Sequence, residues 1–373
     1  MEYVQTETAL RRLVEELGTP TLVAADTEAA GYHRYHDRVC LLQLSTRERT
    51  WIVDTLALDQ LNGLADVFRS RATEVVFHDA DYDLRLLHRD FGITVGALFD
   101  TKIAAQFVGE TSYGLASLVE KYLDVRLAKK FQRADWAQRP LPREMLEYAA
   151  EDTRYLPALR DRLRERLESL GRLGWAEEEF AIEEDVRWRE TSDEDAWLRL
   201  KGTRDLRPRQ LAALRELYRW RERVAEARDA ATFRVLSNEA MIELSRRMPA
   251  SFAGIMEVPG TRRALADRHG AELLAALRRA RELPQSELPE RRRGPGRPPP
   301  DPEFDALMER LREARDEAAS ELELERGFLM PRSQLEEVAR ARPTTLEALA
   351  ALPGIRRWQV EAMGERLVEA VKR

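Results

Sequence analysis

The sequence of 373 residues predicts an α/β domain, with a mixed sheet and flanking helices, followed by two all-α helical modules. Three observations predict this fold class. Short apolar runs typical of strands occur in the N-terminal part, no strand pattern survives after Arg207, and a segment of the helical region is repeated. The chain exceeds the length of one ordinary core, so two or three domains are expected.

The composition limits the possible function classes. With 43% hydrophobic and 34% charged residues and no apolar run of bilayer length, a soluble protein without membrane contact is expected. The N-terminus lacks the basic and apolar regions of a signal peptide, and the single Cys40 suits a reducing cytoplasm. The net charge of −6 predicts that a polyanion would be held locally, by basic patches or by metal. No Gly-Lys pair occurs, which excludes the phosphate-binding loop of an NTPase helicase.

The first predicted strand of the sheet, residues 23–28, ends in two acids. Asp26 and Glu28 are two positions apart, so their side chains project from one face of the strand. Neighbouring carboxylates repel each other unless a cation lies between them. The strand therefore predicts a metal site.

The following elements alternate between strands and helices. Further strands are predicted at 39–44, 51–54 and 74–78, and the three short strands before the first long helix, 23–28, 39–44 and 51–54, suggest an antiparallel start to a mixed sheet. Helices are predicted at 58–69, 81–91, 99–107 and 115–123, the second of them ending at Gly92. Asp83 lies at the start of the second helix, directly after a strand, where α/β folds place their sites.

The stretch 126–143 is predicted to be a loop with six basic residues and one acid. Phe131 and Trp136 are interleaved with the basic residues, and this combination suits phosphates and stacking bases. The candidates for substrate binding are Lys129, Lys130, Arg133 and Trp136. The alternative is a surface loop whose Trp anchors it to the core, and the sequence leaves both open.

A helix is predicted at 143–152 after Pro142, followed by a Leu-rich helical region to about residue 183. Tyr148 and Asp152 are four residues apart and share one face of the helix. The sequence thus offers four candidate ligands for hard ions such as Mg²⁺ or Mn²⁺, namely Asp26, Glu28, Asp83 and Asp152. Two such ions about 4 Å apart can stabilise the attacking and leaving oxygens of a phosphodiester. Tyr148 is placed to position the attacking water.

The helical region contains two copies of one module. Residues 236–273 match residues 330–367 without a gap at a constant separation of 94, as in Pro249 and Pro343. The Pro-rich and basic segment between the copies is predicted to be a linker.

Several motifs identify a family resemblance. Three motifs resemble the exonuclease motifs of the tyrosine-bearing branch of the DEDD superfamily. They are Asp26-Thr27-Glu28, His78-x-Ala80-x-x-Asp83-Leu84 and Tyr148-x-x-x-Asp152. The repeated module resembles the helicase and ribonuclease D C-terminal (HRDC) domain. Together they resemble the ribonuclease D family over nearly the whole chain. Further matches are Asp100-Thr101-Lys102 and Asp135-Trp136 with Arg139-Pro140-Leu141.

The resemblance implies a ribonuclease H-like exonuclease domain at 1–190, HRDC domains at 205–284 and 303–373, and a linker at 285–302. It implies that two divalent ions are held, one by Asp26, Glu28 and Asp152 and the other by Asp26 with Asp83, while Tyr148 orients the water. The implied activity is 3′ to 5′ hydrolysis of structured RNA such as tRNA precursors, with release of nucleoside 5′-monophosphates. The HRDC domains would bind RNA, and the enzyme would be a cytoplasmic monomer. Ala29-Ala30 departs from the family, where many members carry an aromatic residue after the second acid.

Two other functions are compatible with these residues. A DNA 3′ exonuclease would use the same acids, because no residue in the sequence reports contact with a 2′-hydroxyl. A catalytically weak RNA-binding protein is disfavoured by the presence of all four acids and Tyr148. Of the remaining polar residues in these motifs, Asp100 is expected to cap a helix and His78 to support the turn before Asp83.

Overall fold

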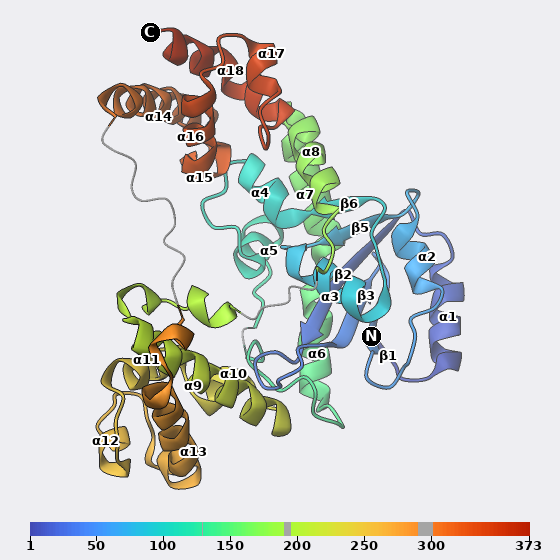
Figure 1. Cartoon of the computed structure of the whole chain (residues 1–373). Helices are drawn as coiled ribbons and strands as arrows, with labels where there is room; N and C mark the ends of the chain where they lie inside the picture. Colours follow the sequence, from blue (N-terminus) through green and yellow to red (C-terminus); the bar gives the residue numbers. More distant parts are fainter. Residues whose placement is uncertain (129, 190–194, 290–300) are drawn as a thin grey trace. The chain divides into compact units, whose positions relative to one another are not determined.

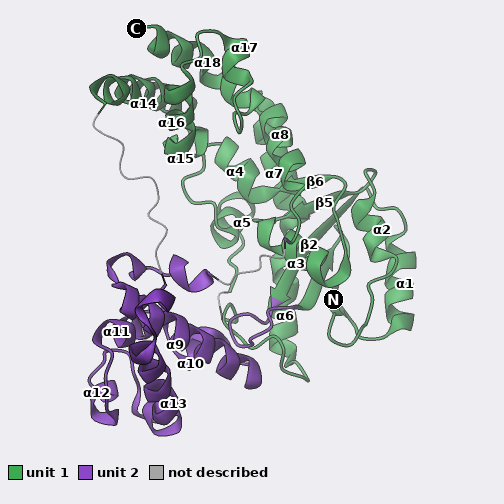
Figure 2. Ribbon diagram, in the orientation of Figure 1, with its two compact units in different colours: residues 1–28, 39–188, 298–373 green, residues 29–38, 189–297 purple. Residues whose placement is uncertain are grey.

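The computed structural model describes residues 1–128, 130–189, 195–289 and 301–373 (Figure 1). The chain forms two compact units (Figure 2). The first unit comprises residues 1–28, 39–188 and 298–373, and the second comprises residues 29–38 and 189–297. Most of the predicted linker at 285–302 lies outside the described residues. Lys129, a predicted substrate-binding residue, also lies outside them.

The first unit contains a six-stranded mixed sheet with the strand order β1-β4-β3-β2-β5-β6. β3 and β4 are antiparallel, whereas the pairs β1 and β4, β2 and β5, and β5 and β6 are parallel. The predicted mixed sheet is confirmed, and the strand that bears Asp26 and Glu28 is an inner strand of it. The strands are β1 (Glu2–Val4), β2 (Leu22–Ala29), β3 (Val39–Ser45), β4 (Thr50–Asp54), β5 (Glu74–Phe77) and β6 (Leu98–Asp100).

Helices surround this sheet, and local sequence signals fix several of their ends. Gly92 follows the third helix with φ of 65°, the left-handed conformation that glycine adopts without strain. The Asp100 carboxylate accepts hydrogen bonds from the amides of Lys102 and Ile103 at 2.7 and 3.0 Å, so its predicted capping role is confirmed. The helices are α1 (Glu7–Leu17), α2 (Leu64–Arg69), α3 (Asp81–Phe91), α4 (Thr101–Phe107), α5 (Leu115–Leu123), α6 (Arg143–Arg154), α7 (Leu156–Ser169) and α8 (Leu173–Glu183).

Four local predictions differ from the structure. Helix α2 begins at Leu64 rather than at residue 58, because Gly63 has φ of 84° and interrupts the helical backbone. Residues 98–100 form β6, since they pair with β5, a partner that local sequence cannot reveal. The Leu-rich region is two helices, α7 and α8, separated by a turn in which Gly171 has φ of 66°. β1 and α1 were not predicted.

The two helical modules have the same helices at the predicted separation of 94 residues. The module in the second unit consists of α9 (Pro208–Ala227), α10 (Thr232–Val235), α11 (Asn238–Arg247), α12 (Phe252–Met256) and α13 (Arg263–Glu282). The module in the first unit consists of α14 (Pro302–Leu322), α15 (Arg326–Leu329), α16 (Arg332–Ala341), α17 (Leu346–Ala350) and α18 (Arg357–Lys372).

The C-terminal module shares its core with the sheet domain. The Trp358 ring of α18 lies 4.9 Å from Phe107 and 5.9 Å from Trp175 and from Phe328, measured between ring centroids. The buried Arg172 guanidinium donates to the carbonyl oxygens of Phe107 and Leu322, both at 2.8 Å. One face of this module is therefore covered by the sheet domain and is closed to RNA.

Polar contacts fix the N-terminus of α18 on α8. The Glu178 carboxylate accepts hydrogen bonds from the amides of Arg357 and Trp358, at 2.9 and 3.1 Å, and caps the helix from another domain. Glu179 accepts the indole N–H of Trp358 at 2.7 Å and pairs with Arg356 at 3.0 Å. At the position of Trp358, the first module carries the exposed Ala264.

The second unit joins the first module to the loop that follows β2. The amide of Ala231 donates to the carbonyl oxygen of His33 at 3.1 Å, and Arg234 Nε donates to that of Tyr32 at 2.9 Å. Asp229 accepts the amide of Tyr35 at 3.2 Å. Figure 2 shows this loop in the colour of the module. The chain thus passes directly from Glu28 into a segment held by the helical module.

Replacing the aromatic anchor of the C-terminal module tests this packing. We expect Trp358→Ala to lower the free energy of unfolding by about 3–5 kcal/mol, the usual cost of removing a buried aromatic ring. Thermal unfolding followed by circular dichroism measures this loss. Trp188→Ala, at a tryptophan that is 40% exposed, is the control and should cost much less. Similar losses for both variants would contradict a shared core.

Candidate active site

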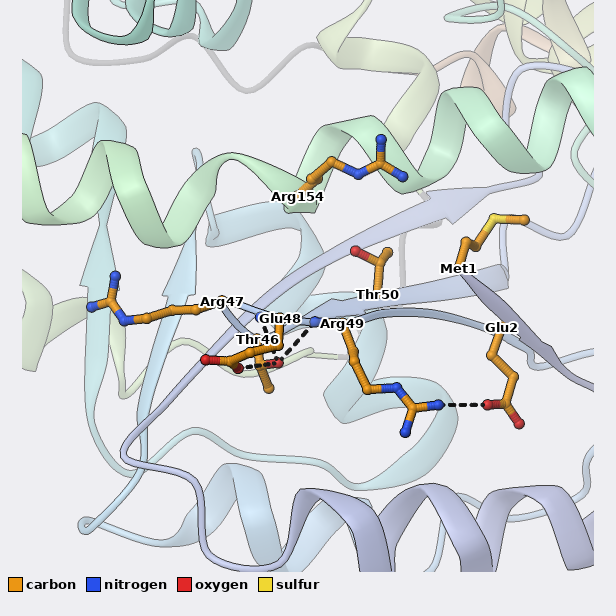
Figure 3. Close-up of a pocket in the computed structure, with 8 residues that line it drawn as sticks. All are labelled: Met1, Glu2, Thr46, Arg47, Glu48, Arg49, Thr50 and Arg154. Carbon is orange, nitrogen blue, oxygen red and sulfur yellow. Dashed lines mark hydrogen bonds and ion pairs between the residues drawn. The ribbon is translucent and has the colours of Figure 1, made fainter.

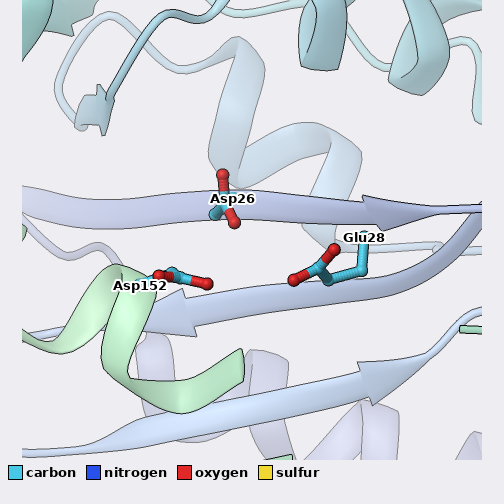
Figure 4. Close-up of side chains that lie close together, drawn as sticks. All are labelled: Asp26, Glu28 and Asp152. Atoms are coloured by element: carbon cyan, nitrogen blue, oxygen red, sulfur yellow. The ribbon is translucent and has the colours of Figure 1, made fainter. Parts of the chain in front are cut away.

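Three carboxylates from two elements meet at one face of the sheet. Asp26 and Glu28 project from β2, and Asp152 approaches from α6 (Figure 4). Each offers an oxygen atom, and these oxygens lie within 4.8 Å of one another. The spacing of the two acids on β2 produces the pair, because alternate side chains of a strand lie on the same face.

Helix α6 is held against β3 and β4 next to Asp152 by buried hydroxyl groups. The Ser45 hydroxyl lies 2.8 Å from that of Thr153 and 2.9 Å from that of Thr50. Thr153 and Ser45 are fully buried. Since Thr153 directly follows Asp152, this contact fixes the backbone that carries the third carboxylate. These hydroxyls cannot be recognised in the sequence, because a polar pair separated by 108 residues leaves no local signal.

The fourth acid, Asp83, lies beside the three rather than among them. It is 8% exposed in the first turn of α3, and it accepts a short hydrogen bond from the Thr27 hydroxyl. Burial raises the pKa values of Asp26 and Glu28, and the nearby charge of Asp83 raises them further. Thr27, between the two acids of β2, had no predicted role and orients Asp83.

The site carries more negative charge than its surroundings neutralise. Burial raises the pKa values of Asp83 and Asp152 to about 7. Burial also raises the pKa values of Asp26 and Glu28, and the neighbouring carboxylates raise them further. Among the described residues, none of the four forms an ion pair with Lys or Arg. A cluster of hard oxygen donors that lacks a cationic partner suits divalent metal ions.

Tyr148 lies one helical turn before Asp152 and is 8% exposed. Burial raises the pKa of its hydroxyl, and Asp152, Glu28 and Asp26 raise it further. The hydroxyl therefore keeps its proton at neutral pH and lies within the field of the three carboxylates. It can position a polar ligand, but it cannot serve as a general base near pH 7.

Comparisons with known proteins identify this arrangement. A family model described as a 3′-5′ exonuclease matches residues 1–168, and the HRDC domain model matches residues 210–277 and 304–371. Ribonuclease D of Acidiphilium cryptum is 34% identical over 302 residues, which cover 79% of this chain and 76% of that protein. This chain belongs to the ribonuclease D family.

Solved structures agree with this assignment. The crystal structure of Escherichia coli RNase D, described as an exoribonuclease involved in structured RNA processing, matches with a TM-score of 0.72 and 29% identity. The match covers 99% of this chain and 98% of that one. A protein from Bifidobacterium adolescentis matches with a TM-score of 0.84 and 26% identity, over 100% of this chain and 97% of that chain.

The family assignment establishes the class of activity. The chain is a 3′-5′ exoribonuclease with an exonuclease domain followed by HRDC domains. Exonucleases of this family depend on divalent metal ions, and the acidic cluster supplies oxygen ligands of the required kind. Across the described residues, no helix has the length and apolar character needed to cross a bilayer.

The residues expected to bind substrate have different environments in this family member. Trp136 is 2% exposed, and the stacking of its indole on a base stays a prediction. The alternative, an anchor for the loop, fits its position. Lys130 is exposed and pairs with Glu144 at 2.7 Å, and Arg133 is also exposed. Lys129 lies outside the described residues.

Other conspicuous polar residues serve the fold. Burial lowers the pKa of His78 to about 4, and its Nδ1 lies 2.9 Å from the Thr101 hydroxyl, so it supports the turn between β5 and α3 and is no base. Three arginines, Arg47, Arg49 and Arg154, line a surface pocket together with Glu2 and Glu48 (Figure 3). Arg47 pairs with Asp161, and Arg49 pairs with Glu2 and Glu16, which reduces the pocket's attraction for anions.

Removing one carboxylate charge tests the acidic cluster. We expect Asp26→Asn to lower the rate of RNA hydrolysis at least about 100-fold, because a bound metal contributes several kcal/mol to the transition state. We also expect Mn²⁺ to raise the melting temperature of the wild type but not that of the variant. Single-turnover assays and thermal unfolding measure the two effects.

Asp81→Asn is the matched control for Asp26→Asn, since the Asp81 carboxylate is occupied by Arg85 at 2.8 Å. It removes the same charge outside the cluster and should retain activity. Full activity of Asp26→Asn would show that Asp26 is no metal ligand.

Proposed function

We propose that the enzyme trims the 3′ ends of structured RNA such as tRNA precursors and releases nucleoside 5′-monophosphates. The observation that supports this best is the convergence of Asp26, Glu28 and Asp152 next to the Tyr148 hydroxyl. A single-stranded 3′ tail can bring its last phosphodiester to such a site, while the rest of the RNA is held elsewhere. The structured RNA of the E. coli relative supports the choice of substrate.

Two divalent ions, Mg²⁺ or Mn²⁺, are part of this proposal. Asp26, Glu28 and Asp152 would hold one ion, and Asp26 with Asp83 would hold the other. When bound, such ions lower the pKa of a bound water and neutralise the charge that develops on the phosphate. The carboxylates themselves provide the negative field that retains the ions, and the Thr27 hydroxyl keeps Asp83 directed toward this field.

Tyr148 would orient the attacking water. Its hydroxyl remains protonated at neutral pH, so it can donate one hydrogen bond and accept another, and it would position the water without taking its proton. Lys130 and Arg133 would contact the RNA backbone from the loop before α6, as exposed cations do. We further propose the domain division at 1–190, 205–284 and 303–373, and a monomeric enzyme of the cytoplasm.

Digestion of a 5′-labelled tRNA that carries a short 3′ extension tests the proposed substrate. We expect stepwise shortening of the extension in Mg²⁺ or Mn²⁺ and none in EDTA, because the acidic site needs its ions. A DNA strand with the sequence of the extension is the control. Equal trimming of RNA and DNA would contradict the proposed preference for RNA.

Removing the tyrosine hydroxyl tests the proposed water-orienting role. We expect Tyr148→Phe to slow single-turnover cleavage roughly 100-fold or more, the usual effect of losing one positioned hydrogen-bonding group. The rise in melting temperature with Mn²⁺ should persist, because the carboxylates remain. Tyr155→Phe, at the end of the same helix, is the control. An unchanged cleavage rate in Tyr148→Phe would remove Tyr148 from the mechanism.

A further inference from the structure

Two aromatic side chains of the loop before α6 enclose the ring of Tyr148. The Trp136 ring is stacked with it at 6.2 Å between centroids and an interplanar angle of 26°, and the Phe131 ring meets it edge-on at 5.7 Å and 76°. Aromatic pairs in these arrangements prefer defined relative orientations. Since Trp136 is almost completely buried, its surface is used for contacts within the protein.

The backbone of Trp136 is fixed by a guanidinium that reaches the sheet. Arg139 donates to the carbonyl oxygen of Trp136 at 2.7 Å and to that of Cys40 at 3.0 Å. The same guanidinium makes two hydrogen bonds to the carboxylate of Asp54, at 2.6 and 2.8 Å. A bidentate pair of this kind is strong and geometrically specific.

The anchor of this arrangement is the end of β4. Asp54 is 1% exposed and also accepts a hydrogen bond from the Tyr3 hydroxyl at 2.6 Å. On the other side of the loop, Lys130 pairs with Glu144 of α6. The loop is thus connected both to the sheet that carries Asp26 and Glu28 and to the helix that carries Tyr148 and Asp152.

We infer that Trp136 is a positioning residue for hydrolysis, which fixes the Tyr148 ring so that its hydroxyl faces the three carboxylates. The Asp54–Arg139 pair holds Trp136 in place. This inference rests on the proposed role of Tyr148. Helix α6 determines where the side chain of Tyr148 begins but not how its ring is turned. Displacement of a reacting group by about 1 Å can cost on the order of 100-fold in rate.

The indole N–H of Trp136 has no hydrogen-bond partner among the described residues. Phenylalanine at this position therefore retains a stacking ring without breaking a hydrogen bond, whereas leucine retains apolar volume but no ring. The pair Trp136→Phe and Trp136→Leu separates ring stacking from simple filling of space.

A double-mutant cycle with Tyr148→Phe tests the inference. Single-turnover cleavage of a 5′-labelled single-stranded RNA in saturating metal would be measured for Trp136→Leu and Trp136→Phe, each with Tyr148 and with Phe at position 148. We expect Trp136→Leu to reduce the rate about 10- to 100-fold when Tyr148 is present and to cause no further loss in the Tyr148→Phe background. Trp136→Phe should remain within about threefold of the wild type, because its ring still stacks on Tyr148.

Trp51→Leu controls for a general loss of stability, because Trp51 is also 2% exposed and its indole N–H also lacks a partner. It should unfold at a lower temperature but cleave at nearly the wild-type rate below that temperature. If Trp136→Leu does not fold, Arg139→Lys is taken through the same cycle, because it keeps a positive charge opposite Asp54 but loses the bidentate geometry and the hydrogen bond to the Trp136 carbonyl oxygen.

The outcomes separate this inference from the proposed function. Equal rate losses from Trp136→Leu with and without the Tyr148 hydroxyl, or no loss at all, would overturn the positioning role while Tyr148 kept its own. A wild-type enzyme that leaves RNA uncut would instead refute the proposed function. A Tyr148→Phe variant that cleaves at full rate would remove the role of Tyr148, and this inference with it, while leaving the proposed RNA trimming intact.

Discussion

Repulsion among four carboxylates is the constraint on which the rest of the structure depends. Within the part of the chain that the structure describes, no Lys or Arg side chain forms an ion pair with the four acids, Asp26, Glu28, Asp83 and Asp152. For Asp83, burial raises the pKa to about 7, so the cost of keeping a buried carboxylate charged adds to this repulsion. The fold has to offset this cost with contacts elsewhere, and a bound cation would relieve it.

Those contacts lie directly behind the acids. An inner strand of the sheet carries Asp26 and Glu28, and the buried hydroxyls of Ser45 and Thr153 fasten α6 beside them. The loop with Trp136 is fixed to the end of β4 by Arg139. Each part of the site therefore lies on an element that is itself paired or buried. The positions of the charged side chains are fixed by these elements rather than by contacts among the charges.

The sequence predicts those parts of the site that depend on local spacing. The i, i+2 acids of β2 and the i, i+4 pair on α6 follow from the periods of strand and helix. Their convergence does not follow from any local pattern; it was a hypothesis from the chemistry that the four acids share, and the family resemblance supported it. The strand β6 was missed because its partner β5 lies about 20 residues earlier in the chain. For Trp136 the sequence leaves two alternatives open, since an aromatic residue in a basic loop has the same pattern whether it faces RNA or the core.

The duplicated module shows how one sequence pattern can serve two purposes. Trp358 and Ala264 occupy the same position in the two copies, yet one is buried in the core shared with the sheet domain and the other is exposed. Selection on the stability of the catalytic domain consequently acts on the face of the C-terminal module that contains Trp358. It acts much less on the corresponding face of the first module, which contains Ala264. The two copies are thus expected to accept substitutions at very different rates, and this face of the first copy is the one free to diverge.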